Sequence, residues 1–231
     1  WISVSFWTGC VGFLLVAIRR DPLTLQRPQE PRSRLPAHTA KSMYSVRTAI
    51  VLPAFEEDPD ALGATVSSLV RSLVNAGAER AFHIHILSDS QSASAGHREE
   101  QMWVRVQARH PEVPIFYRRR EANTGRKAGN IAEFCSRCGG RYEYMVVLDA
   151  DSVMTAATLV ALVERMDADP GLGLIQTVPI PALQTTPFGR LVQFAASLYG
   201  PVLAAGLSFW QGDAANYWGH NAIIRVARSE E

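Results

Sequence analysis

The stretch Tyr144-Met145-Val146-Val147-Leu148-Asp149-Ala150-Asp151-Ser152 is an apolar run that ends in two carboxylates separated by one residue. Alternate side chains of a strand share a face, so Asp149 and Asp151 can point together from its carboxyl end. Magnesium and manganese prefer oxygen ligands, and magnesium typically takes one or two carboxylates plus phosphate oxygens of a substrate. The pair therefore predicts a site for a metal-bound phosphate compound. The alternative is a solvated turn whose acidic residues cap the next helix.

Apolar runs alternate with helical patterns on both sides of this stretch. The strands are predicted near residues 48–52, 83–87, 115–117, 144–148, 173–177 and 222–226, and the helices at 60–76, 97–109, 127–138 and 155–167. Short buried strands that alternate with helices are typical of an α/β sandwich with a mixed, mostly parallel sheet. Ligands of such sheets bind beyond the carboxyl ends of the strands.

The composition is that of an ordinary globular enzyme. The 231 residues are 47% hydrophobic and 19% charged with a net charge of +1, so nothing indicates a nucleic-acid partner. Cys10, Cys135 and Cys138 are too few for a disulfide framework, which favours a reducing compartment. Cys135-x-x-Cys138 resembles half a zinc site, but it lies in a helical stretch with no second pair nearby, so we expect no zinc.

The N-terminal part indicates membrane association. Residues 1–18 form a nearly uncharged apolar run, which we interpret as a partial transmembrane helix, with a signal peptide as the weaker alternative. Residues 19–45 form a basic, proline-rich linker, which the positive-inside rule assigns to the cytoplasm. The globular domain is predicted over residues 46–231. A second apolar run at 188–210 contains Gly200-Pro201, so we expect an interrupted helix packed on the domain or lying on a membrane surface.

Other predicted strand ends carry unusual polar residues. The first strand opens onto Phe55-Glu56-Glu57, and the second ends at Asp89, which can accept hydrogen bonds from a nucleobase or ribose. Lys127 follows Gly125 at the start of a helix, where a cation is unfavourable unless an anion binds there. We interpret Arg118–Arg120 by default as a solvated basic loop.

Together these segments resemble glycosyltransferase family 2, the nucleotide-sugar enzymes of GT-A fold. The matching strings are Ile50-Val51-Leu52-Pro53-Ala54-Phe55-Glu56-Glu57, Ser88-Asp89-Ser90, Arg126-Lys127-Ala128-Gly129-Asn130 and Asp149-Ala150-Asp151. Longer strings are similar to the bacterial inner-membrane members that build osmoregulated periplasmic glucans: Phe116–Arg120, Met145–Met154 and Tyr217–Arg225.

The resemblance implies an inverting glucosyltransferase that faces the cytoplasm, uses UDP-glucose and extends a β-1,2-linked glucan acceptor. It assigns a Mg²⁺ or Mn²⁺ ion to Asp149 and Asp151. The residues implied for the nucleotide sugar are Pro53, Phe55, Glu57, Asp89, Lys127, Asn130 and Asp149. Those implied for the acceptor side are Tyr217, Trp218, Gly219, His220 and Asn221.

One departure from the family pattern concerns the catalytic base. Family members supply a carboxylate base downstream of the Gly219-His220-Asn221 string, and we expect it beyond Glu231, so that the glycosyltransferase domain in this chain is incomplete. Three alternatives stay open: a synthase of cellulose or hyaluronan type, a nucleotide-sugar-binding regulator without catalysis, and a phosphohydrolase with Asp149 as nucleophile.

Overall fold

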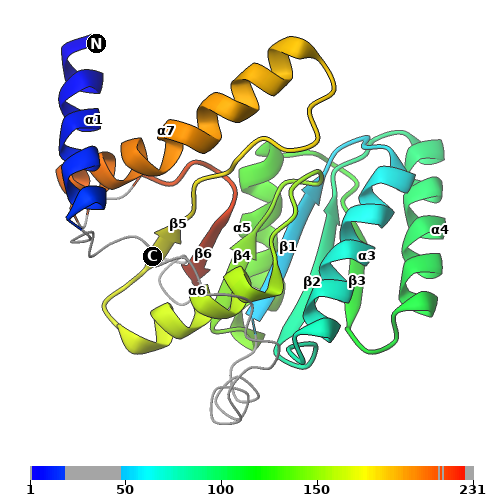
Figure 1. Ribbon diagram of the computed structural model, residues 1–231. Coiled ribbons are helices and arrows are strands. Elements are labelled where there is room, and N and C mark those ends of the chain that lie inside the picture. Colours follow the sequence, from blue (N-terminus) through cyan, green and yellow to red (C-terminus); the bar gives the residue numbers. More distant parts are fainter. Residues whose placement is uncertain (1, 19–47, 213, 215, 227–231) are drawn as a thin grey trace. The chain divides into compact units, whose positions relative to one another are not determined.

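The computed structural model describes residues 2–18, 48–212, 214 and 216–226 (Figure 1). The predicted linker at 19–45 lies outside the described residues. The chain divides into two compact units, one made of residues 1–27 and 176–217 and the other of residues 28–175 and 218–231. We describe each unit by itself.

The larger unit holds the sheet. Its elements in chain order are β1 Thr48–Ala54, α3 Pro59–Asn75, β2 Phe82–Ser88, α4 Ala93–Arg109, β3 Ile115–Arg119, α5 Arg126–Cys138, a 3₁₀ turn Gly139–Arg141, β4 Tyr144–Val147, α6 Ala156–Ala168, β5 Leu174–Gln176 and β6 Ala222–Arg225. The strand order is β3-β2-β1-β4-β6-β5, with β1, β2, β3 and β4 parallel and β6 antiparallel to β4. This is the predicted mixed, mostly parallel sheet.

The sheet is covered on both faces, and Figure 1 shows α5 on one face and α3, α4 and α6 on the other. On the α5 face, Ala49, Val51 and Met145 pack with Phe134 in a buried cluster. The alternate residues of β1, such as Ile50 and Leu52, are also completely buried, because helices cover both sides of the sheet. The resulting core fixes the level at which each parallel strand ends.

The predicted elements are all present, with one helix start displaced. α4 begins at Ala93, four residues before the predicted start at residue 97. The Ser92 side chain caps this helix by accepting a hydrogen bond from the backbone N–H of Ala95. Its first turn is made of small residues without an apolar period, which explains why the pattern missed it.

The smaller unit contains two apolar helices, α1 Ile2–Ala17 and α7 Pro187–Gln211. α7 runs through Pro201 without a break, so the predicted interruption at Gly200-Pro201 is wrong. A proline removes one backbone donor, and the many remaining hydrogen bonds of a 25-residue helix sustain the flanking turns. Gly12 of α1 lies against the Val202 backbone of α7, and Gly206 of α7 lies against that of Thr8, with no room for a Cβ at either glycine.

Candidate nucleotide-sugar site

Polar residues gather at the edge where the parallel strands end. Ala54 of β1 pairs with Ser88 of β2, and Ser88 pairs with Arg119 of β3, so these three strands end level with one another. Asp89 follows β2 directly, and its N–H donates to the Ala54 carbonyl at 2.8 Å. Asp149 follows β4 after one further residue, Leu148, whose N–H donates to Val51 of β1 at 3.0 Å. We call this carboxyl-terminal end of the sheet, which carries Asp89 and Asp149, the polar edge. It is where the sequence predicted that a ligand binds.

Asp149 is the point at which three separate segments of the larger unit meet. The Lys127 ammonium at the start of α5 forms an ion pair with Asp149 Oδ1. His220 Nδ1, just before β6, lies 3.6 Å from Asp149 Oδ2. The neighbouring Asn221 N–H donates to the Val147 carbonyl at 2.7 Å, which ties the segment containing His220 to the end of β4. The Asp149 side chain is still 38% exposed, so this cluster is open to a ligand.

The turn before α5 needs two glycines, Gly125 just before the helix and Gly129 in its first turn. Gly125 has φ 69° and caps the helix in the left-handed region, which favours a residue without a Cβ. At Gly129 a Cβ would overlap the Thr124 carbonyl, so only glycine lets the first helical turn close over that oxygen. The backbone thus brings Lys127 to the polar edge.

Asp89 is held at the edge by a buried ion pair. Its side chain is 5% exposed, and Arg120 Nε donates to its Oδ1 at 2.6 Å. Arg120 is itself buried, so the interpretation of Arg118–Arg120 as a solvated basic loop is wrong for this residue. Burial of the charge is tolerated because Asp89 neutralises it.

Glu99 of α4 is a buried residue that the sequence analysis missed. It is completely buried, and it accepts hydrogen bonds from Ser88 Oγ at 2.5 Å, Ser90 Oγ at 2.6 Å and Tyr117 Oη at 2.9 Å. Burial and the Glu99 charge raise the pKa of Tyr117, which keeps that hydroxyl a donor. The residues on both sides of Asp89 are therefore fixed by one carboxylate. Glu99 lies in a charged helical stretch, so the sequence gave no signal that its side chain faces inward.

The remaining residues predicted for the nucleotide sugar divide into exposed and buried ones. Phe55 and Glu57 are exposed in the loop after β1, and the backbone N–H of Glu56 between them donates to Ser90 Oγ at 2.8 Å. Pro53 is half-buried within β1.

Asn130 differs, because it is completely buried and its Nδ2 donates to the Leu87 carbonyl at 3.0 Å. Its side chain also accepts a hydrogen bond from Arg118. These contacts brace β2 and β3 against α5.

The five predicted acceptor-side residues are consecutive and lie just before β6. Tyr217 and Trp218 are partly exposed aromatics, and Gly219 has φ 91°. Asn221 is buried with φ 52°, in the left-handed region that asparagine tolerates better than most residues. Of the five, His220 is the residue that the structure brings to Asp149.

The sequence that forms this edge is similar to known proteins. The sequence model described as Glycosyl transferase family 2 matches residues 49–230, which include the whole polar edge. The chain belongs to this family. The α/β sheet of the larger unit is accordingly the GT-A fold that the sequence predicted.

Two curated relatives from Shewanella oneidensis and Shewanella baltica (strain OS155) carry the name glucans biosynthesis glucosyltransferase H. Each is 42% identical to this chain over 227 residues, which is 98% of the chain and 29% of the relative. The family 2 chain therefore spans less than a third of the length of these relatives.

Solved structures similar to this family 2 chain include two glycosyltransferases. Glucosyl-3-phosphoglycerate synthase from Mycobacterium tuberculosis, in complex with Mn²⁺, UDP and phosphoglyceric acid, is 16% identical with a TM-score of 0.49, over 89% of this chain and 64% of that one. Mannosyltransferase PcManGT from Pyrobaculum calidifontis, in complex with GDP-Man and Mn²⁺, is 14% identical with a TM-score of 0.48, over 82% of this chain and 49% of that one.

The donor set at the end of β4 fits a divalent cation that is shared with a ligand. Among the described residues no group of three or more His, Cys, Asp or Glu side chains could hold a metal by itself. Asp149 and the exposed Asp151 offer carboxylate oxygens from one turn, which is a set that Mg²⁺ or Mn²⁺ uses together with phosphate oxygens. Lys127 already holds positive charge against Asp149.

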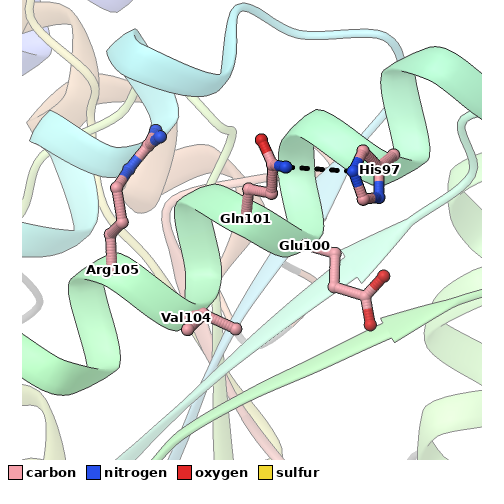
Figure 2. A pocket seen from close by; sticks show the side chains of 5 residues that line it. All are labelled: His97, Glu100, Gln101, Val104 and Arg105. Carbon is pink, nitrogen blue, oxygen red and sulfur yellow. Dashed lines mark hydrogen bonds between the residues drawn. The ribbon is translucent and has the colours of Figure 1, made fainter.

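Two surface hollows of the larger unit lie away from this edge. One, of about 430 Å³, is on the exposed side of α4 and is lined by His97, Glu100, Gln101, Val104 and Arg105, with Gln101 and His97 hydrogen-bonded at 2.9 Å (Figure 2). Another, of about 530 Å³, lies between α3 and α4. Neither contains a residue of the polar edge, so the candidate site rests on the clustered charges.

Proposed function

We propose that the protein containing this chain transfers glucose from UDP-glucose to a growing glucan. The observation that carries the proposal is the meeting of Lys127, Asp149 and His220 at the end of β4. Lys127 and Asp149 come from strings that resemble glycosyltransferase family 2, and His220 comes from the longer Tyr217–Arg225 string. The chain belongs to that family. The name of the curated relatives supports glucose as the sugar and a glucan as the product.

Each part of the polar edge has a proposed task. Asp149 and Asp151 hold Mg²⁺ or Mn²⁺, which when bound stabilises the negative charge that develops on the departing diphosphate. Lys127 lies at the same carboxylate and adds positive charge there. Asp89, Phe55 and Glu57 form the nucleoside side, with Pro53 in the strand beneath them.

His220 and the partly exposed Tyr217 and Trp218 are proposed for the acceptor side, since aromatic faces suit the C–H surfaces of sugars. Gly219 and Asn221 shape the backbone of this segment through their positive φ angles. The polymer is proposed to be the β-1,2-linked backbone of osmoregulated periplasmic glucans, formed by an inverting reaction.

Calorimetric titration tests the site directly. The protein, as its gene encodes it, is titrated with UDP-glucose, UDP-galactose and GDP-mannose, each with and without Mn²⁺. We expect UDP-glucose to bind most tightly and only weakly without metal. Metal-independent binding, or no preference for UDP, contradicts the site assignment. Linkage analysis of the polymer made from UDP-glucose separates a β-1,2-glucan from cellulose-type or hyaluronan-type products.

The helical unit supports a membrane location. α7 is long and apolar enough to cross a membrane by length and composition, and α1 is a shorter apolar helix. Both expose large apolar side chains, among them Phe6, Trp7 and Phe13 of α1 and Phe188, Phe194 and Trp210 of α7. Close contact through Gly12 and Gly206 is the packing that small residues allow between membrane helices.

We propose that this unit lies in the bacterial inner membrane with the glycosyltransferase domain in the cytoplasm. Membrane fractionation tests it: the protein should stay with the bilayer after washing at alkaline pH, and its release by that wash contradicts the proposal.

A further inference from the structure

The Arg120 guanidinium lies at the centre of the polar edge without being one of its exposed groups. It is the first residue after β3, and its side chain is 7% exposed. The ion pair with Asp89 uses Nε. A guanidinium has five N–H donors in one plane, so four donors remain for other partners.

The hydrogen bonds of the other two nitrogens go to a single turn, and Nη1 also lies 3.9 Å from Glu133 Oε2 of α5. Arg120 Nη1 donates to the Thr124 carbonyl at 3.0 Å, and Nη2 donates to the Arg126 carbonyl at 3.1 Å. A longer contact of 3.4 Å joins Nη2 to Asn123 Oδ1. The two carbonyls lie on either side of Gly125, so one rigid group holds both sides of the turn that leads to Lys127.

This turn has an unfavourable backbone. Gly125 and Arg126 both have positive φ, 69° and 51°, and for the arginine this conformation is unfavourable because its Cβ is crowded by the backbone. Lys127 then places a cation in the first turn of α5, where the helix dipole opposes it. An unfavourable backbone conformation persists when surrounding contacts stabilise it. The hydrogen bonds from Arg120 to the turn are such contacts.

We propose that Arg120 is a positioning residue that couples the two halves of the nucleotide site. It binds Asp89 on the nucleoside side with one nitrogen and the Lys127 turn on the diphosphate side with the other two. Lysine cannot replace it, because an ammonium has three donors and lacks the planar fork. The inference rests on the proposed function, since it assigns Arg120 an effect on nucleotide binding that acts through Lys127.

A double-mutant cycle tests this coupling. In the protein as its gene encodes it, the Kd for UDP with Mn²⁺ is measured for Arg120→Lys, Lys127→Met and the double variant. If Arg120 acts through Lys127, each single change weakens binding by about tenfold and the double variant is hardly weaker than either single one. Effects that multiply, to about a hundredfold in the double variant, overturn the proposal. Unchanged binding by Arg120→Lys overturns it as well.

A matched control comes from Arg105, which pairs with Asp60 at 3.4 Å on the surface. Arg105→Lys makes the same chemical change in an exposed Arg–Asp pair and should leave the Kd for UDP unchanged. If Arg120→Lys does not fold, the cycle is repeated on Asp89→Asn with Arg120→Gln, which replaces the buried charges by two neutral amides. Lys127→Met should then have little further effect on UDP binding, and a full tenfold effect contradicts the coupling.

Hydrogen exchange without ligand separates this inference from the proposed function. In Arg120→Lys the amides of residues 123–127 should exchange about fivefold faster or more, while those of β1 and β2 keep the wild-type rate. Equal exchange in the turn overturns the role of Arg120. If the wild-type protein does not bind UDP while the turn loosens as expected, the proposed function fails and the contacts made by Arg120 stand as structural.

Discussion

The carboxylates at the two ends of the polar edge are held in opposite ways. After β2, Asp89 and Glu99 are buried, with an arginine on one and three hydroxyl donors on the other. After β4, Asp149 is more than a third exposed and Asp151 is also exposed. A buried carboxylate must have its partners inside the fold, whereas an exposed one can exchange them. The first pair therefore sets the shape of the site, and the second is free to respond to a ligand.

The largest expected effect is on the exposed pair. Asp151→Ala should lower glucosyl transfer by about 100-fold or more, because a metal contributes several kcal/mol of charge stabilisation. The free energy of unfolding should stay unchanged, since the side chain is exposed. Transfer assays over a range of Mn²⁺ concentrations, with urea unfolding alongside, measure both quantities. Asp60→Ala, an exposed aspartate outside the site, is the control, and equal activity of the two variants contradicts the role of Asp151.

For the buried carboxylates we expect the main effect on stability, and Glu99 is the residue to test. Glu99→Gln removes an acceptor that two serines and a tyrosine share, so the free energy of unfolding should fall by about 1–3 kcal/mol. Urea unfolding at pH 7 checks this. Glu100→Gln, at the exposed neighbouring position, should change stability by less than about 0.5 kcal/mol. If the two variants were equally stable, Glu99 would not be holding the segment around Asp89.

His85, a buried residue on the α5 face of the sheet, shows mainly the effect of burial on a titratable group. Burial lowers the pKa of His85 from 6.5 to about 4, assisted by the charges of His83, Arg141 and Arg118. Above pH 6.5 the ring is neutral in both folded and unfolded states. As the pH falls from 6.5 towards 4, the unfolded chain takes up a proton that the folded one does not, so stability is lost across this range.

Between pH 7 and pH 5 this loss should be about 2 kcal/mol. His85→Gln, which keeps a hydrogen-bonding group near the Tyr142 hydroxyl, should flatten the dependence of unfolding free energy on pH over that range. His97→Gln on the exposed side of α4 is the matched control for the chemical change. An equally steep profile in His85→Gln would refute the assignment.

The smallest expected effect is the stability change at the exposed ion pair. Lys127→Met breaks the contact with Asp149, but both side chains are more than a third exposed, so the free energy of unfolding should change by less than about 1 kcal/mol. Urea unfolding measures this, with the exposed Arg137→Met, which breaks the pair with Glu133, as the control. A loss as large as that of Glu99→Gln would make Lys127 a structural residue and remove the contrast between the two ends of the edge.

Much of the fold could be predicted because burial leaves a pattern in the chain. The runs that became β1 and β4 are nearly continuous in apolar residues, as expected for strands covered on both faces. The start of α4 was missed because its first turn is made of small residues and its boundary depends on the Ser92 cap. The interruption expected in α7 was wrong, because the rule for proline describes a local cost and not the outcome over 25 residues.

The candidate site was predictable where a residue type is unusual for its place. Lys127 at a helix start is unfavourable without an anion, and Asp149 and Asp151 follow an apolar strand at the place where ligands of such sheets bind. Glu99 and Arg120 carried no such signal, because a glutamate in a charged helix and an arginine in a basic run look solvated. The complete burial of Asn130 and its hydrogen bond to the backbone of β2 could not be predicted from the motif either.

The sequence by itself therefore determined the order of the strands and helices, the polar ends of the strands and the glycines that the Lys127 turn needs. The tertiary structure alone decided which charged side chains are buried and what they hold. The reason is physical: the apolar period of a segment is a local property, whereas the burial of a charge depends on partners elsewhere in the chain. Asp89 meets Arg120 31 residues later, and Glu99 meets Tyr117 18 residues later, only after β2 and β3 have paired.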